Sequence, residues 1–107
     1  MKMFLDDIRV PKNDYDVIVR SFEEAINFVK ENGIPTFISF DHDLGCYEIG
    51  KILKSFYDFA KWLVDMDIEN IYKFPNNFTF DIHSANPIGK NNIKSILNNY
   101  LLFKVRY

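Results

Sequence analysis

Four short apolar runs, each ending at polar residues, predict the strands of one sheet. The runs are residues 3–5, 15–19, 36–40 and 78–82. They are rich in β-branched and aromatic residues, which favour strands. Residues 102–105 fit a final edge strand, and residues 68–72 fit either a short strand or an irregular link.

Apolar residues at helical spacing predict three helices between and after these strands. The first begins at a capping box, in which Ser21 caps the first turn and Glu24 reaches back to the Ser21 amide, and it ends at Gly33. An apolar stripe over residues 49–64 predicts a long second helix, and residues 91–101 predict a third.

Aromatic residues widen the stripe of the second predicted helix. They are Tyr57, Phe59 and Trp62. Burial in the core or against a partner explains them better than a base-stacking platform does. The stripe permits a dimer without requiring one, so the sequence leaves the oligomeric state open.

Strands that alternate with helices predict an α/β layered fold with a mainly parallel sheet, in a single domain over residues 1–107. Ligands of such sheets bind outside the carboxyl ends of the strands. Three polar clusters stand at these predicted ends, at residues 5–11, 39–45 and 83–89. We therefore expect the three clusters to form one shared site.

Composition favours a folded protein in a reducing compartment. Of the 107 residues 48% are hydrophobic and 17% aromatic, so a core can form and disorder is not expected. The net charge of −2 offers no basic face, which argues against general DNA binding. Cys46 is the single cysteine, so no internal disulfide can form.

We expect no segment of this sequence to direct the protein to a membrane or out of the cell. Its first residues are too few and too soon acidic for a signal peptide, and no apolar run is long enough for a membrane span. We expect a cytoplasmic protein with no membrane partner.

The first polar cluster places two carboxylates side by side after a predicted strand. Asp6 and Asp7 repel each other unless a cation or an arginine lies between them. With Asp41 they would form an oxygen-rich site for Mg²⁺ or Mn²⁺, and no organic cofactor is expected. Alternatively, one of the pair caps the next turn. Arg9 fits either a phosphate contact or a surface salt bridge.

The second cluster surrounds a histidine with carboxylates. Asp41 and Asp43 flank His42, and a neighbouring carboxylate would orient the imidazole and raise its basicity. The alternative is a hydrogen-bonded turn that Gly45 closes.

The third cluster follows the fourth predicted strand. His83 and Ser84 come first, and Asn86 and Gly89 then shape a tight loop whose amides suit an anion ahead of a helix. A buried histidine satisfied by the sheet end is the alternative. Two histidines that face one phosphate would act as general base and general acid.

Taken together, the clusters resemble the cyclic-phosphate processing receiver-like domains, small relatives of response-regulator receivers that are common in phages and bacteria. The resembling segments are Leu5-Asp6-Asp7-Ile8-Arg9-Val10-Pro11, Ser39-Phe40-Asp41-His42-Asp43-Leu44-Gly45 and His83-Ser84-Ala85-Asn86-Pro87-Ile88-Gly89. The resemblance implies a flavodoxin-like three-layer sandwich with about five strands. It also implies a role on 2′,3′-cyclic phosphate RNA ends or cyclic nucleotides, with a divalent metal at Asp6, Asp7 and Asp41.

The chain departs from the receiver pattern in several places. The segment after Arg9 is short for a helix, and His42 follows the acceptor-like Asp41. His83 and Ser84 stand where receivers carry Ser or Thr. These departures favour a reworked phosphate site over a phosphorelay.

The leading hypothesis is therefore a phosphoesterase that acts on a cyclic phosphate. The candidate catalytic residues are His42, His83 and Asp41, with Asp43 orienting His42, and the candidate phosphate ligands are Arg9, Ser84, Asn86 and Gly89. Three alternatives stay open: a non-catalytic protein that binds or sequesters a cyclic nucleotide, a receiver that accepts a phosphoryl group on Asp41, and a structural or protein-binding domain.

Overall fold

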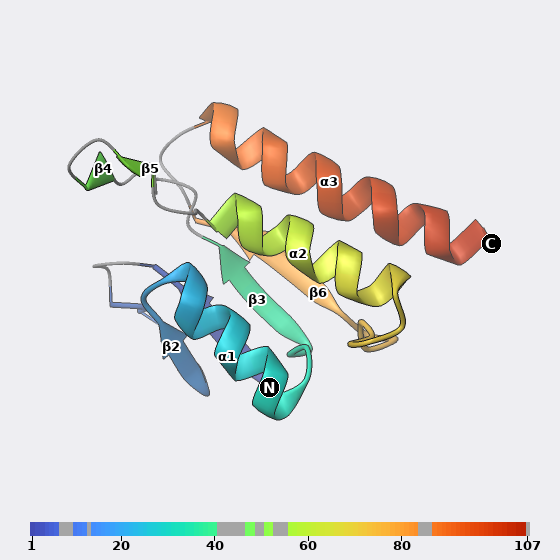
Figure 1. Ribbon diagram of the computed structural model, residues 1–107, viewed down its shortest axis with the longest axis horizontal. Coiled ribbons are helices and arrows are strands. Elements are labelled where there is room, and N and C mark those ends of the chain that lie inside the picture. The colour runs from blue at the N-terminus through green and yellow to red at the C-terminus, as the bar shows by residue number, and fades with distance from the viewer. Residues whose placement is uncertain are drawn as a thin grey trace.

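The computed structural model describes residues 1–6, 10–12, 14–40, 47–48, 51–52, 56–83 and 87–106. Its centre is a parallel sheet with the strand order β2-β1-β3-β6 (Figure 1). The strands of this sheet are β1 (Lys2–Leu5), β2 (Val17–Val19), β3 (Phe37–Phe40) and β6 (Thr79–Ile82). A separate antiparallel pair consists of β4 (Tyr47–Glu48) and β5 (Lys51–Ile52). The helices are α1 (Phe22–Asn32), α2 (Phe56–Ile68) and α3 (Pro87–Arg106).

One face of the sheet packs against all three helices. Successive side chains of a strand point to opposite faces, so only alternate residues can reach this side. The strands contribute Met3, Leu5, Val19, Ile38, Phe40 and Ile82 to one buried cluster. The helices contribute Ala25, Val29, Phe59, Ala60, Leu63, Ile93 and Leu97 to the same cluster. The apolar core therefore lies between the sheet and a single layer of helices.

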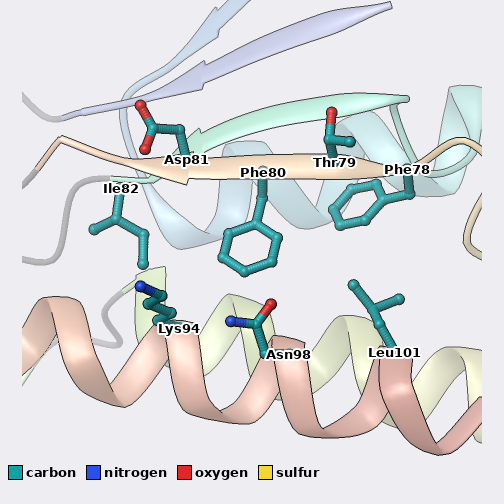
Figure 2. A pocket seen from close by; sticks show the side chains of 8 residues that line it. All are labelled: Phe78, Thr79, Phe80, Asp81, Ile82, Lys94, Asn98 and Leu101. Carbon is teal, nitrogen blue, oxygen red and sulfur yellow. The ribbon is translucent and has the colours of Figure 1, made fainter.

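The intervening side chains lie on the opposite face of the sheet, which no described helix covers. They are Lys2, Phe4, Ile18, Phe37, Ser39, Thr79 and Asp81, and we call this surface the open face. Figure 2 shows the division along β6, where Phe80 and Ile82 point toward α3 while Thr79 and Asp81 point away from it. Ile18, Thr79 and Asp81 are exposed, whereas Phe4 and Ser39 are buried.

Local hydrogen bonds define both ends of α1. The Glu24 amide donates to the Ser21 side chain at 3.1 Å, as the capping box predicts. The Glu24 carboxylate accepts from the Arg20 amide at 2.6 Å, one residue earlier than the sequence analysis expected. Gly33 ends the helix with φ +84°, and its amide donates to the Val29 carbonyl at 2.7 Å.

The α/β class with a parallel sheet is confirmed, although the details differ. In the described part of the chain this sheet has four strands rather than about five, and the helices form one layer rather than two. The described residues between β1 and β2, 10–12 and 14–16, form no helix, so no described helix covers the open face at this point.

Two element boundaries also differ from the sequence prediction. The expected edge strand at 102–105 is wrong, because these residues continue α3. The second helix begins at Phe56 rather than near residue 49, since β4 and β5 come first. After α2 ends at Ile68, residues 69–72 form an irregular link rather than a strand.

No helix in the described ranges is long and apolar enough to cross a membrane.

A buried carboxylate ties α2 to α3 near the amino ends of the strands. Asp67 is 1% exposed and accepts hydrogen bonds from the Tyr100 hydroxyl, the Phe74 amide at 2.9 Å and the Lys104 ammonium at 3.0 Å. Burial alone would raise the pKa of Asp67, but these hydrogen bonds and the charge of Lys104 hold it below its usual value. Burial and the contact with Asp67 raise the pKa of Tyr100 to about 12.

We expect this network to make stability depend on pH at both extremes. The contribution of Asp67 is complete above its unfolded pKa of 3.8 and is lost as the pH falls through the lower folded value. The contribution of Tyr100 is complete below pH 10 and is lost as the pH rises toward its folded pKa of about 12. Urea unfolding at a series of pH values between 2 and 11 measures the free energy of unfolding, and its decrease toward low pH (the acid limb) and high pH (the alkaline limb) reports the two contributions.

The variants Asp67→Asn and Tyr100→Phe test the two contributions separately. Each removes a partner from a buried hydrogen bond, so we expect a loss of about 1–3 kcal/mol at pH 7. Asp67→Asn should also flatten the acid limb, and Tyr100→Phe the alkaline limb. Asp65→Asn, an exposed position of the same helix, is the matched control. An Asp67→Asn protein with the wild-type acid limb would contradict this account.

Candidate functional site

A histidine is held between a buried carboxylate and a buried hydroxyl at the carboxyl ends of β1, β3 and β6. The His83 Nε2 atom lies 3.0 Å from Asp6 Oδ2, and its Nδ1 atom lies 2.7 Å from Ser39 Oγ. Asp6 is 0% exposed and Ser39 3% exposed, whereas the His83 side chain is 20% exposed. One edge of the imidazole therefore faces solvent while both ring nitrogens face the protein.

Strand register explains why residues so far apart in sequence meet here. Leu5 of β1 pairs with Phe40 of β3, and Phe40 pairs in turn with Ile82 of β6. Asp6 and His83 each follow the end of a strand, so both fall at the same edge of the sheet. The His83 amide continues the ladder by donating to the Phe40 carbonyl at 2.9 Å.

The backbone on either side of this cluster is fixed as well. The Asp6 amide donates to the Val19 carbonyl of β2 at 3.2 Å. The Arg20 guanidinium donates to the Asp6 carbonyl at 3.2 Å. The main chain of Asp6 is therefore hydrogen-bonded to Val19 and Arg20, and its side chain contacts His83, directly after β6.

A ring contact sets the plane of the imidazole. Phe4 and His83 stack with their centroids 4.4 Å apart and their planes within 8° of parallel. Phe4 is only 6% exposed, so its ring is held by surrounding residues and gives His83 a fixed surface to pack on. The stack and the two hydrogen bonds together leave His83 little freedom to rotate.

The chemistry of the partners indicates where the His83 protons lie. An ionised carboxylate only accepts hydrogen bonds, so Nε2 carries a proton toward Asp6. A serine hydroxyl both donates and accepts, so Ser39 can pair with Nδ1 whether or not that nitrogen is protonated. A substrate oxygen would bond to either nitrogen only by replacing Asp6 or Ser39.

The structure describes part of the predicted site. It brings Asp6 and His83 together, and it places Gly89 in the first turn of α3. The other candidates lie outside the described residues: Asp7, Arg9, Asp41, His42, Asp43, Ser84 and Asn86. Their assigned roles stay predictions.

Three residues of the cluster were not among the candidate site residues. Ser39, Phe4 and Arg20 each contact Asp6 or His83. A signal for Ser39 exists in hindsight, because a hydroxyl between the apolar Ile38 and Phe40 has to find a partner when its strand is buried.

Of the three candidate metal ligands, Asp6 lies within the described residues. Within the described ranges, no three His, Cys, Asp or Glu side chains converge on a metal position. Asp6 supplies a buried carboxylate of the hard oxygen type that Mg²⁺ and Mn²⁺ prefer. Asp7 and Asp41, the other two candidate ligands, fall outside the described residues.

The fold and this edge of the sheet define a receiver-like α/β domain with a polar site at the carboxyl ends of parallel strands. Residues 1–99 match the family of the cyclic-phosphate processing receiver domain. The chain belongs to this family, which associates it with cyclic-phosphate processing. Neither the curated proteins nor the solved structures gave a match.

We expect the pair formed by Asp6 and His83 to couple strongly in stability. His83→Ala removes a proton donor from a fully buried carboxylate, which costs about 3 kcal/mol when a buried pair is broken. In the double variant with Asp6→Asn, part of this loss should disappear, with a coupling energy of roughly 1–3 kcal/mol.

Chemical denaturation of the wild type, both single variants and the double variant measures the coupling. Thr79→Ala, an exposed position on the same face, should change stability by less than about 0.5 kcal/mol. Strictly additive effects of the two site variants would show that the contact carries no energy of its own.

Proposed function

We propose that this domain hydrolyses the cyclic phosphodiester of a nucleotide, either a free cyclic nucleotide or the 2′,3′-cyclic phosphate at an RNA end. Family membership supports the substrate class. The observation that carries the proposal is the imidazole of His83, held by buried partners and partly exposed where parallel sheets bind ligands.

Hydrolysis needs a base and an acid on opposite sides of the phosphorus. Water attacks the phosphorus, one ring P–O bond breaks, and a phosphomonoester forms. The base takes a proton from the water and the acid gives one to the leaving oxygen. His42 and His83 would share these roles, with Asp43 orienting His42. Asp6 would hold Nε2 of His83, so His83 would exchange its proton through Nδ1 once the substrate displaces the Ser39 hydroxyl.

The remaining candidates would hold the phosphate. The Arg9 guanidinium would donate two hydrogen bonds to the phosphate oxygens. The Ser84 hydroxyl and the amides near Asn86 and Gly89 would donate others, as amides at a helix N-terminus do to anions. A divalent metal held by carboxylates at this edge would neutralise charge that develops on the phosphate oxygens. Of these carboxylates, Asp6 is the one whose surroundings the structure describes, and its contact with His83 holds it in place.

Incubation with a panel of cyclic nucleotides and cyclic-phosphate RNA ends, with and without Mg²⁺ or Mn²⁺, tests this function by phosphorus NMR. We expect His83→Gln, which keeps a donor for Asp6 but removes the imidazole, to lower turnover about 10²- to 10⁴-fold. His42→Ala should have a loss in the same range. Asn27→Ala, an exposed position on α1, is the control.

Unchanged hydrolysis in both histidine variants would show that the acid and base lie elsewhere. Absence of turnover by the wild type on every substrate would contradict the enzymatic proposal.

A second candidate is binding without hydrolysis, and one observation favours it. Both ring nitrogens of His83 already have protein partners. The imidazole can therefore form part of a binding surface without exchanging a proton with the ligand. Calorimetry that shows binding, with no product after long incubation with either metal, would select this function.

A further inference from the structure

Aromatic rings lead away from His83 across the open face. Phe4 stacks on His83, Tyr15 lies against Phe4 with centroids 5.1 Å apart, and Phe37 lies 6.2 Å from Tyr15. We call these rings, from His83 to Phe37, the aromatic path. It starts at the site and runs toward the amino ends of the strands, on the side that no described helix covers.

Exposure changes along this path. Phe4 is buried beneath its two neighbours, whereas Tyr15 and Phe37 are each partly exposed. Phe37 precedes Ser39 by two residues on β3, a separation of roughly 7 Å along a strand. The partly exposed rings of Tyr15 and Phe37 are therefore connected to the imidazole by ring contacts of 6.2 Å or less between centroids.

The Phe37 ring is partly exposed and has a charged side chain over it. The Lys2 ammonium lies over this ring, 5.9 Å from its centroid. Lys2 is exposed, and its side chain is long and flexible, so an incoming ring can displace it.

Charge on this face limits the size of the occupant. Lys2 is offset by the exposed Asp81 on the same face, and the whole chain carries a net charge of −2. A long polyanion needs a continuous basic surface, which this face does not offer. A single uncharged planar ring meets no such requirement, since stacking on an aromatic side chain does not depend on net charge.

From this juxtaposition we infer that the open face binds the nucleobase of the nucleotide whose cyclic phosphate lies beside Asp6 and His83. The base stacks on Tyr15 and Phe37. This inference rests on the proposed function and adds where the base of that nucleotide binds and that the base contributes to affinity. Stacking tolerates any base, so little discrimination among the four bases is expected.

The wild-type protein alone tests this inference. Calorimetry compares nucleoside 2′,3′-cyclic phosphates with ribose 2′,3′-cyclic phosphate, which lacks the base. We expect the base to tighten binding roughly 5- to 150-fold, the range that base–aromatic stacking spans. A trinucleotide ending in a cyclic phosphate separates RNA ends from free nucleotides as the source of the ligand. If the trinucleotide binds more tightly than the mononucleotide, the open face binds RNA ends. If the two bind equally, it binds free nucleotides.

Two variants locate the stacking rings. Tyr15→Leu and Phe37→Leu keep apolar bulk but remove the ring, so each should lose most of the preference for the base while binding of the base-free ligand stays unchanged. Phe103→Leu removes a 56% exposed ring from α3, outside this face, and should keep the preference. Circular dichroism of each variant confirms that it is folded.

The outcomes separate the two proposals. Equal binding of the base-containing and base-free ligands would overturn the base subsite and leave the proposed function intact. Binding of neither ligand would overturn both. A concentration-dependent dimer that dissociates in Tyr15→Leu and Phe37→Leu, with no base preference, would assign the open face to a second copy of the chain and overturn this inference.

Discussion

A carboxylate with no solvent exposure is the constraint around which this domain is organised. Burial of an ionised group costs several kcal/mol unless proton donors compensate it, and Asp6 receives one from His83. His83 is in turn held by Ser39 and by the Phe4 ring. These partners lie on β1, on β3 and directly after β6, so the contacts between Asp6, His83 and Ser39 depend on the observed order and register of three strands.

The two faces of the sheet differ in the residues that they contact. On one face, apolar side chains pack with three helices, and the Asp67 network joins α2 to α3 near the amino ends of the strands. On the other face lie the aromatic path and, at the carboxyl edge, Asp6 with its partners. No described helix covers the open face, so a ligand that bound there would contact strand residues directly.

Local signals in the sequence predicted most elements, and long-range contacts explain the misses. Ser21 and Gly33 form their hydrogen bonds within one helical turn, so the ends of α1 could be predicted from the local sequence. Residues 102–105 read as a strand, yet Lys104 reaches Asp67, 37 positions away, and that contact favours continuing α3. Ser39 was missed for the same reason, because its partner His83 lies 44 positions away.

Strand alternation has a consequence for how this chain can change over time. A single inserted or deleted residue in β1 would exchange the roles of its two sets of side chains. Met3 and Leu5 would leave the core at the moment that Phe4 and Asp6 entered it. Insertions within β1 should therefore abolish the fold and the contacts of Asp6 together, so length variation among descendants of this sequence belongs in the links between strands.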